Sequence, residues 1–110
     1  MAITTFKATV RKKEGLKVEG EARGFKVIID EPEELGGTNQ GMNPVELVLC
    51  SLGSCQTILA ASFAEKSRVD LEDFWVDVEG ELDPDGFMGL SDVRPGYSVQ
   101  VDKAKYTIEK

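Results

Sequence analysis

The sequence predicts an α+β protein in which an antiparallel sheet packs against one long buried helix. Three observations carry this prediction. The first thirty residues alternate between polar and apolar side chains, residues 47–64 contain no charged side chain, and two more alternating segments follow that apolar run. Strands placed before and after a single helix are typical of α+β domains.

Three segments near the N-terminus have the period-two alternation of strands: residues 3–11, 16–22 and 25–30. Glu14-Gly15 and Arg23-Gly24 separate them, and such short glycine-containing connections favour tight turns. The sequence therefore predicts an antiparallel meander.

A glycine- and glutamate-rich loop at residues 31–42 leads into the helix, and three start signals agree on where the helix begins. Asn43 is a suitable N-cap, Pro44 suits the first helical position, and Glu46 completes a capping box. A helix is predicted over residues 44–66. Because residues 47–64 are apolar around most of the helix circumference, this helix is expected to be buried. Five polar residues interrupt the run and argue against a membrane span: Ser51, Ser54, Gln56, Thr57 and Ser62.

Residues 71–82 and 97–108 are the last two predicted strands, joined by a turn-rich segment at 83–96. A length of 110 residues with 41% hydrophobic content suits one domain. One short sheet cannot cover a helix that is apolar on every side, so the remaining surface is expected to contact a second copy of the chain. The sequence thus predicts a homodimer.

The composition excludes several functions. A net charge of -7 disfavours binding to nucleic acids and to anionic membrane surfaces. The chain has no histidine, which removes His-based triads and imidazole metal sites. We expect no cofactor and no metal ion. The N-terminal residues lack the apolar core of a signal peptide, so a cytoplasmic location is expected.

The two cysteines, Cys50 and Cys55, are five residues apart on the predicted helix. Ideal helix geometry separates their Cα atoms by about 8.6 Å, which exceeds the roughly 7 Å limit for a disulfide. The two thiols therefore cannot pair while the helix is intact.

Several motifs resemble the OsmC/Ohr family of osmotically inducible and organic hydroperoxide resistance proteins, in its OsmC-like branch. The resembling segments are DEPEELGG at residues 30–37, GMNPVEL at 41–47, LGSC at 52–55 and RPGY at 94–97. The resemblance implies an intertwined homodimer with active sites at the subunit interface. It also implies a thiol peroxidase that reduces organic hydroperoxides in oxidative stress defence and is reset by an external thiol reductant. Cys55 falls on the family's peroxidatic cysteine.

The resemblance also bears on the rest of the site. The family's peroxidases place a carboxylate two residues after the motif asparagine, where this chain has Val45, and Glu46 follows one position later. Their activating arginine lies in the N-terminal hairpin. The candidates here are Arg23, Lys13 and Arg11, of which Lys13 is nearest by counting. No cysteine follows Cys55, so the chain is expected to be a single OsmC-like domain, residues 1–110, shortened at its C-terminus and without the resolving cysteine.

Each candidate residue also has a purely structural interpretation. Cys55 and Cys50 fit an apolar core, Glu46 fits a helix cap, and the turn cations fit a solvated surface. Two functions therefore stay open. One is a thiol-dependent peroxidase that uses Cys55, and the other is a dimeric, non-catalytic binding or structural module with the same fold.

Overall fold

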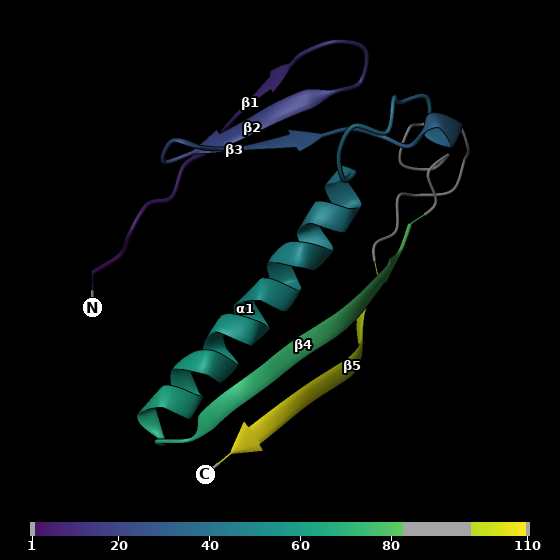
Figure 1. Cartoon of the computed structure of the whole chain (residues 1–110). Coiled ribbons are helices and arrows are strands. Elements are labelled where there is room, and N and C mark those ends of the chain that lie inside the picture. The colour runs from purple at the N-terminus through teal and green to yellow at the C-terminus, as the bar shows by residue number, and fades with distance from the viewer. Residues whose placement is uncertain (1, 83–97, 110) are drawn as a thin grey trace. The chain divides into compact units, whose positions relative to one another are not determined.

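A computed structural model of the chain describes residues 2–82 and 98–109 (Figure 1). The predicted turn-rich segment at 83–96 lies outside these residues. The described chain contains antiparallel strands and one long helix, which confirms the predicted α+β class. It divides into two compact units, Met1–Leu47 and Val48–Lys110.

The first unit contains a three-stranded antiparallel sheet with the order β1-β2-β3. Its strands are β1 (Thr9–Lys12), β2 (Val18–Ala22) and β3 (Phe25–Ile29). β1 begins six residues later than predicted, because its partner β2 ends at Ala22 and the last register pair is Thr9 with Glu21. Residues 2–8 consequently extend past the sheet, with Ile3 98% and Phe6 84% exposed.

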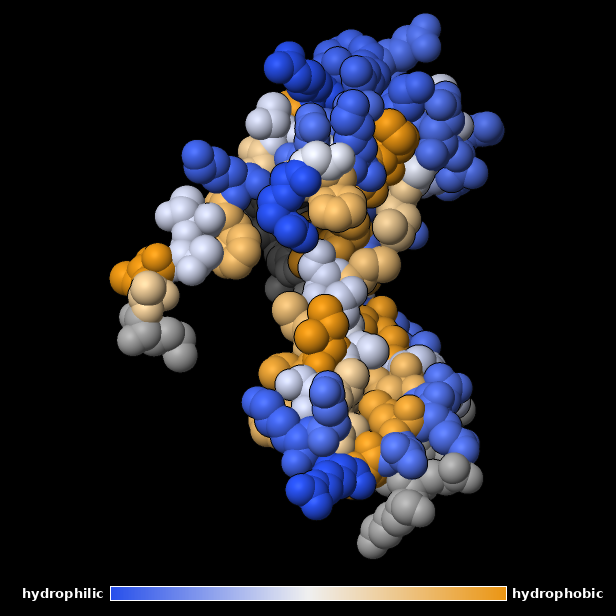
Figure 2. All heavy atoms as spheres, turned by 60° about the vertical axis from the view of Figure 1, so that its left-hand side comes forward, coloured by the Kyte–Doolittle hydropathy of each residue, from blue (hydrophilic) through white to orange (hydrophobic). Residues whose placement is uncertain are grey.

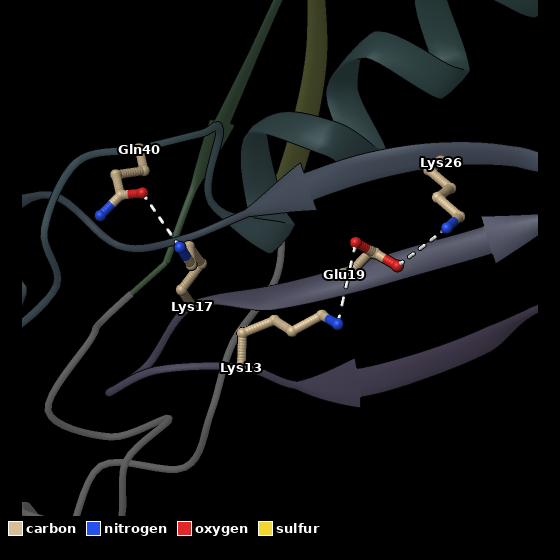
Figure 3. Close-up of polar contacts among 5 residues, drawn as sticks. All are labelled: Lys13, Lys17, Glu19, Lys26 and Gln40. Atoms are coloured by element: carbon tan, nitrogen blue, oxygen red, sulfur yellow. Dashed lines mark hydrogen bonds and ion pairs between the residues drawn. The ribbon is translucent and has the colours of Figure 1, made fainter.

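The two faces of this sheet differ in polarity. Val10, Gly20 and Val27 are register neighbours on one face, and Ile29, on the same face, is the only buried apolar side chain among residues 2–82. On the other face, Glu19 lies 4.0 Å from Lys13 and 3.8 Å from Lys26 (Figure 3). Because both lysines are exposed and Glu19 is only half-buried, each ion pair contributes at most about 1 kcal/mol. The apolar face therefore contributes more to packing than the charged one.

The helix α1 (Pro44–Lys66) has the predicted bounds, and its cap is the predicted capping box. The Glu46 amide donates to Asn43 Oδ1 at 2.8 Å, and the Asn43 amide donates to Glu46 Oε1 at 2.9 Å. By length and composition alone, α1 is long and apolar enough to cross a membrane. The core helices of soluble proteins meet the same two criteria. After the helix, Val69 donates its amide hydrogen to the Ala64 carbonyl, and the chain turns into the next strand.

The second unit places a two-stranded antiparallel sheet beside α1 (Figure 1). Its strands are β4 (Asp70–Glu81) and β5 (Ser98–Glu109). Exposure alternates along β4: Phe74, Val76 and Val78 are half-buried, whereas the residues between them are exposed. Gly53 on α1 faces this strand, since a Cβ built on it would lie 3.4 Å from Val78 Cγ2.

The burial predicted for α1 is absent in the single chain. No residue of α1 is buried, and Ile58, Leu59 and Phe63 are all more than half exposed. Apolar side chains accordingly reach the molecular surface in Figure 2. The physical reason is that the described residues of this unit cover only one side of the helix. The apolar sides that remain need another covering surface.

The contact at Gly53 generates a prediction. Gly53→Ala should leave the melting temperature unchanged or raise it, because alanine favours a helix by about 1 kcal/mol and the added methyl group would reach Val78 at 3.4 Å. Gly53→Leu should lower it by forcing β4 away from α1. Circular dichroism melts of the two variants test this, and an unchanged melt for Gly53→Leu would contradict the packing.

Candidate functional site

Asp30, at the end of β3, organises the loop that precedes α1. Its side chain is 2% exposed, and its carboxylate accepts hydrogen bonds from three residues of that loop. The donors are the Glu31 amide at 2.8 Å, the Thr38 amide at 3.3 Å, the Thr38 hydroxyl at 2.6 Å and the Gln40 amide at 3.3 Å. The Asp30 amide donates to the Met42 carbonyl at 3.0 Å. These bonds fold the loop back onto β3 and fix where α1 begins.

Two glycines of the loop allow this close folding. A Cβ at Gly37 would collide with the Glu31 carbonyl oxygen, and one at Gly41 would collide with the Ile28 carbonyl oxygen. Only glycine permits such an approach between backbone segments. The spacing of glycines in this loop is therefore explained by backbone packing.

The pKa values of Asp30 and Glu31, at the start of the loop, are shifted in opposite directions. The hydroxyl hydrogen bond from Thr38 lowers the pKa of Asp30, opposed by desolvation and assisted by the backbone donors. Burial raises the pKa of Glu31, a hydrogen bond with the Asn43 side chain opposes this, and the charges of Glu46 and Asp30 add to the rise. The carboxylate of Glu31 is thus linked to the residue that caps α1.

Glu46 is held at the helix cap and lies far from Cys55. Nine residues along an ideal helix give a rise of about 13.5 Å and a rotation of about half a turn, which separates the Cα atoms by about 14 Å. Glu46 therefore cannot contact the Cys55 thiol of its own chain. The capping interpretation of Glu46 is confirmed by its hydrogen bonds.

The two cysteines lie on different faces of α1. Both are exposed, and neither forms a disulfide. Cys50 lines a groove of about 620 Å³ between α1 and β4, together with Gly53, Trp75 and Val78. Cys55 does not line this groove, as expected from the 140° rotation between helix positions five apart. Cys55, the cysteine at the position of the family motif, therefore lies on a side of α1 that faces away from β4.

The candidate cations all lie in the first unit. Arg23 occupies the β2–β3 turn with a φ of 53°, and its guanidinium lies 5.3 Å from the centre of the Phe25 ring. Lys13 lies 4.0 Å from Glu19, and Arg11 is paired in register with Glu19 across β1 and β2. Cys55 belongs to the second unit. Among the described residues, no group of three His, Cys, Asp or Glu side chains could hold a metal ion.

The sequence interpretation did not identify the role of Asp30 and Thr38. Both lie within or beside a motif that was recognised, but their hydrogen bonds join residues eight positions apart. The available signal was an aspartate that directly follows an apolar strand and precedes a loop of Gly, Thr and Asn residues.

The fold and the helix thiol define an α+β protein with a free cysteine on a long apolar helix. Residues 37–110 match the family model of OsmC-like proteins, so this chain belongs to that family. It also resembles two solved structures. One is an OsmC-like protein of unknown function from Vibrio cholerae, with a TM-score of 0.75, 16% identity, and coverage of 98% of this chain and 77% of that one.

The other solved structure is an organic hydroperoxide resistance protein OsmC from Legionella pneumophila, also described as a predicted redox protein and regulator of sulfide bond formation. Its TM-score is 0.68 at 23% identity, with coverage of 97% of this chain and 74% of that one. At these identities both likenesses concern the fold. No curated protein matches the chain.

The Asp30 cluster generates a pH prediction. A carboxylate with a lowered pKa stabilises the folded state above its unfolded pKa, near 3.8, and this stabilisation is lost as the pH falls through the folded pKa. Asp30→Asn should therefore lower the melting temperature at pH 7 and should reduce the loss of stability below pH 3.8. Urea unfolding between pH 2 and pH 7 measures both effects. Glu33→Asn, at the exposed first position of the short 3₁₀ helix Glu33–Leu35, is the control, and equal behaviour of the two variants would contradict the role of Asp30.

Proposed function

We propose that this protein is a thiol-dependent peroxidase that reduces organic hydroperoxides through Cys55 in oxidative stress defence. One observation supports this above all: Cys55 is an exposed thiol at a fixed interval from a capped helix start in a chain of the OsmC-like family. The name of the Legionella relative is consistent with this chemistry.

The reaction follows from thiolate chemistry. The Cys55 thiolate attacks one peroxide oxygen and breaks the O–O bond, which gives a sulfenic acid and, after protonation, an alcohol. An external thiol then displaces water to form a mixed disulfide, and a second thiol releases Cys55 as a thiolate. The two electrons that reduce the peroxide therefore come from the external thiols.

Cys50 is not the partner for the sulfenic acid. It lies on the side of α1 that faces β4, whereas Cys55 lies outside that groove. This separation supports an external reductant. Two reduced thiols also suit a reducing compartment such as the cytoplasm.

A cation near Cys55 would favour the thiolate. We propose that a second copy of the chain supplies it from its N-terminal hairpin, with Arg23 as the first candidate and Lys13 and Arg11 as alternatives. Arg23 suits this role because the turn and the Phe25 ring hold its guanidinium in place at the surface. The uncovered apolar sides of α1 give the reason for dimerisation.

One observation favours the alternative, a non-catalytic dimeric module. Glu46, the carboxylate nearest to the position where the family's peroxidases carry one, is occupied by the helix cap. If peroxide reduction requires that carboxylate, this chain has the fold without the peroxidase activity. Assays of peroxide consumption separate the two functions.

Cys55→Ser should abolish consumption of cumene hydroperoxide in the presence of a dithiol, because it removes the nucleophile. Cys50→Ser should retain most of the activity, since Cys50 lies on another face of α1. Intact mass after peroxide treatment without reductant should locate the first oxidation on Cys55. Equal loss of activity in both variants would overturn the assignment, and no consumption by the unmodified protein would support the non-catalytic module.

A further inference from the structure

Asn43, the N-cap of α1, lies between two carboxyl groups. Its amide donates to Glu46 Oε1 at 2.9 Å, and its side-chain oxygen accepts from the Glu46 amide at 2.8 Å. Its side chain also forms a hydrogen bond with the carboxyl group of Glu31. Because an asparagine side chain has one oxygen and one NH2 group, the oxygen caps the helix and the NH2 group donates to Glu31. The helix cap therefore holds the carboxyl groups of Glu31 and Glu46 near each other.

The carboxyl groups of Asp30 and Glu31 are neighbours in the sequence but have opposite surroundings. Asp30 accepts four hydrogen bonds from N–H and O–H donors at 2.6–3.3 Å, which favours its ionised form. Glu31 is half-buried, and the charges of Glu46 and Asp30 act on it from α1 and from the end of β3. Burial and like charges both disfavour the ionised form. Protonation is therefore favoured at Glu31 and disfavoured at Asp30.

We propose that the loop of residues 31–42 and the cap of α1 form a pH-sensitive switch in which Glu31 takes up the proton. With Glu31 protonated and Asp30 ionised, the loop is held onto β3 and the cap carries the charge of Glu46 alone. Ionisation of Glu31 places a second negative charge at the cap and weakens the link between the loop and the helix. The switch concerns the first unit and is independent of the chemistry proposed for Cys55.

The backbone around Glu31 leaves the carboxyl group little freedom to move away. The Glu31 carbonyl accepts from the Asn39 amide at 3.0 Å, and a Cβ at Gly37 would collide with the same carbonyl. The Glu31 amide donates to the Asp30 carboxylate. Ionised Glu31 must therefore stay beside Glu46 or turn its side chain off Asn43, which breaks a hydrogen bond. Either response loosens the start of α1.

The two carboxyl groups confine the tight state to a pH window. Burial raises the pKa of Glu31 above its ordinary value of 4.5, the hydrogen bond from Asn43 opposes this, and the neighbouring charges add to the rise. A group with a raised folded pKa contributes stability below its unfolded pKa, and this contribution is lost as the pH rises through the folded pKa. Asp30 has the opposite sign, because its pKa is lowered from 3.8. Both contributions are favourable only at mildly acidic pH.

Neutralising Glu31 tests the switch. Glu31→Gln keeps an oxygen that accepts from Asn43, and it should raise the melting temperature by about 2 °C at pH 7. At about pH 3.5, below the ordinary pKa of 4.5, it should have no effect. Glu34→Gln makes the same change in net charge at an exposed position of the 3₁₀ helix and is the control for circular dichroism melts. A gain at pH 7 no larger than that of the control would overturn the proposal.

A double-mutant cycle tests the contact between the two carboxyl groups. Glu46→Gln keeps an oxygen that accepts from the Asn43 amide but removes the charge. At pH 7 the gain from Glu31→Gln should be smaller by about a third in the Glu46→Gln background, and at about pH 3.5 the two backgrounds should agree. The same gain in both backgrounds at pH 7 would show that the charge of Glu46 does not act on Glu31, and would overturn the switch.

The side-chain NH2 group of Asn43 reports on the proton directly, because it donates to Glu31. Its proton NMR signals should titrate with a midpoint above pH 4.5, the ordinary pKa of a glutamate, and this titration should disappear in Glu31→Gln. A midpoint at or below that value, or the same titration in Glu31→Gln, would overturn the assignment of the proton to Glu31. This measurement does not depend on how much either variant changes the melting temperature.

Discussion

The apolar circumference of α1 is the constraint on which the rest of the structure depends. A helix of 23 residues whose central 18 are uncharged must be covered, yet no residue of it is buried in the single chain. β4 covers one side through Phe74, Val76 and Val78. The remaining apolar sides are not covered by the described residues of the single chain and need another covering surface.

The residues that determine where α1 begins are different from those that cover its apolar sides. The capping box of Asn43 and Glu46 satisfies the first amides of the helix, and the buried carboxylate of Asp30 holds the preceding loop. Both devices consist of hydrogen bonds within the first unit. The start of the helix, and with it the position of Cys55 along the helix, is therefore fixed by polar contacts that do not depend on covering the apolar sides.

Local patterns predicted the helix well and the strands less well. The bounds of α1 followed from Asn43, Pro44 and the uncharged run, all of which act within a few residues of each other. The start of β1 was predicted too early, because the alternation of residues 3–8 continues past the end of β2, and a strand extends only as far as its partner. The role of Asp30 was missed because its partners lie eight and ten residues away. For the candidate site, helix geometry alone predicted that the two thiols cannot form a disulfide while the helix is intact.

Residues 3–8 alternate like a strand, yet β1 begins only at Thr9. These residues have the pattern of a strand, but β2 cannot pair with them because it turns at Arg23 and Gly24. An alternating segment without a partner in its own sheet is costly in water, since Ile3 and Phe6 are almost fully exposed. The alternation that predicted a strand from Ile3 therefore gives one only from Thr9 onward, where β2 supplies the hydrogen-bonding partners.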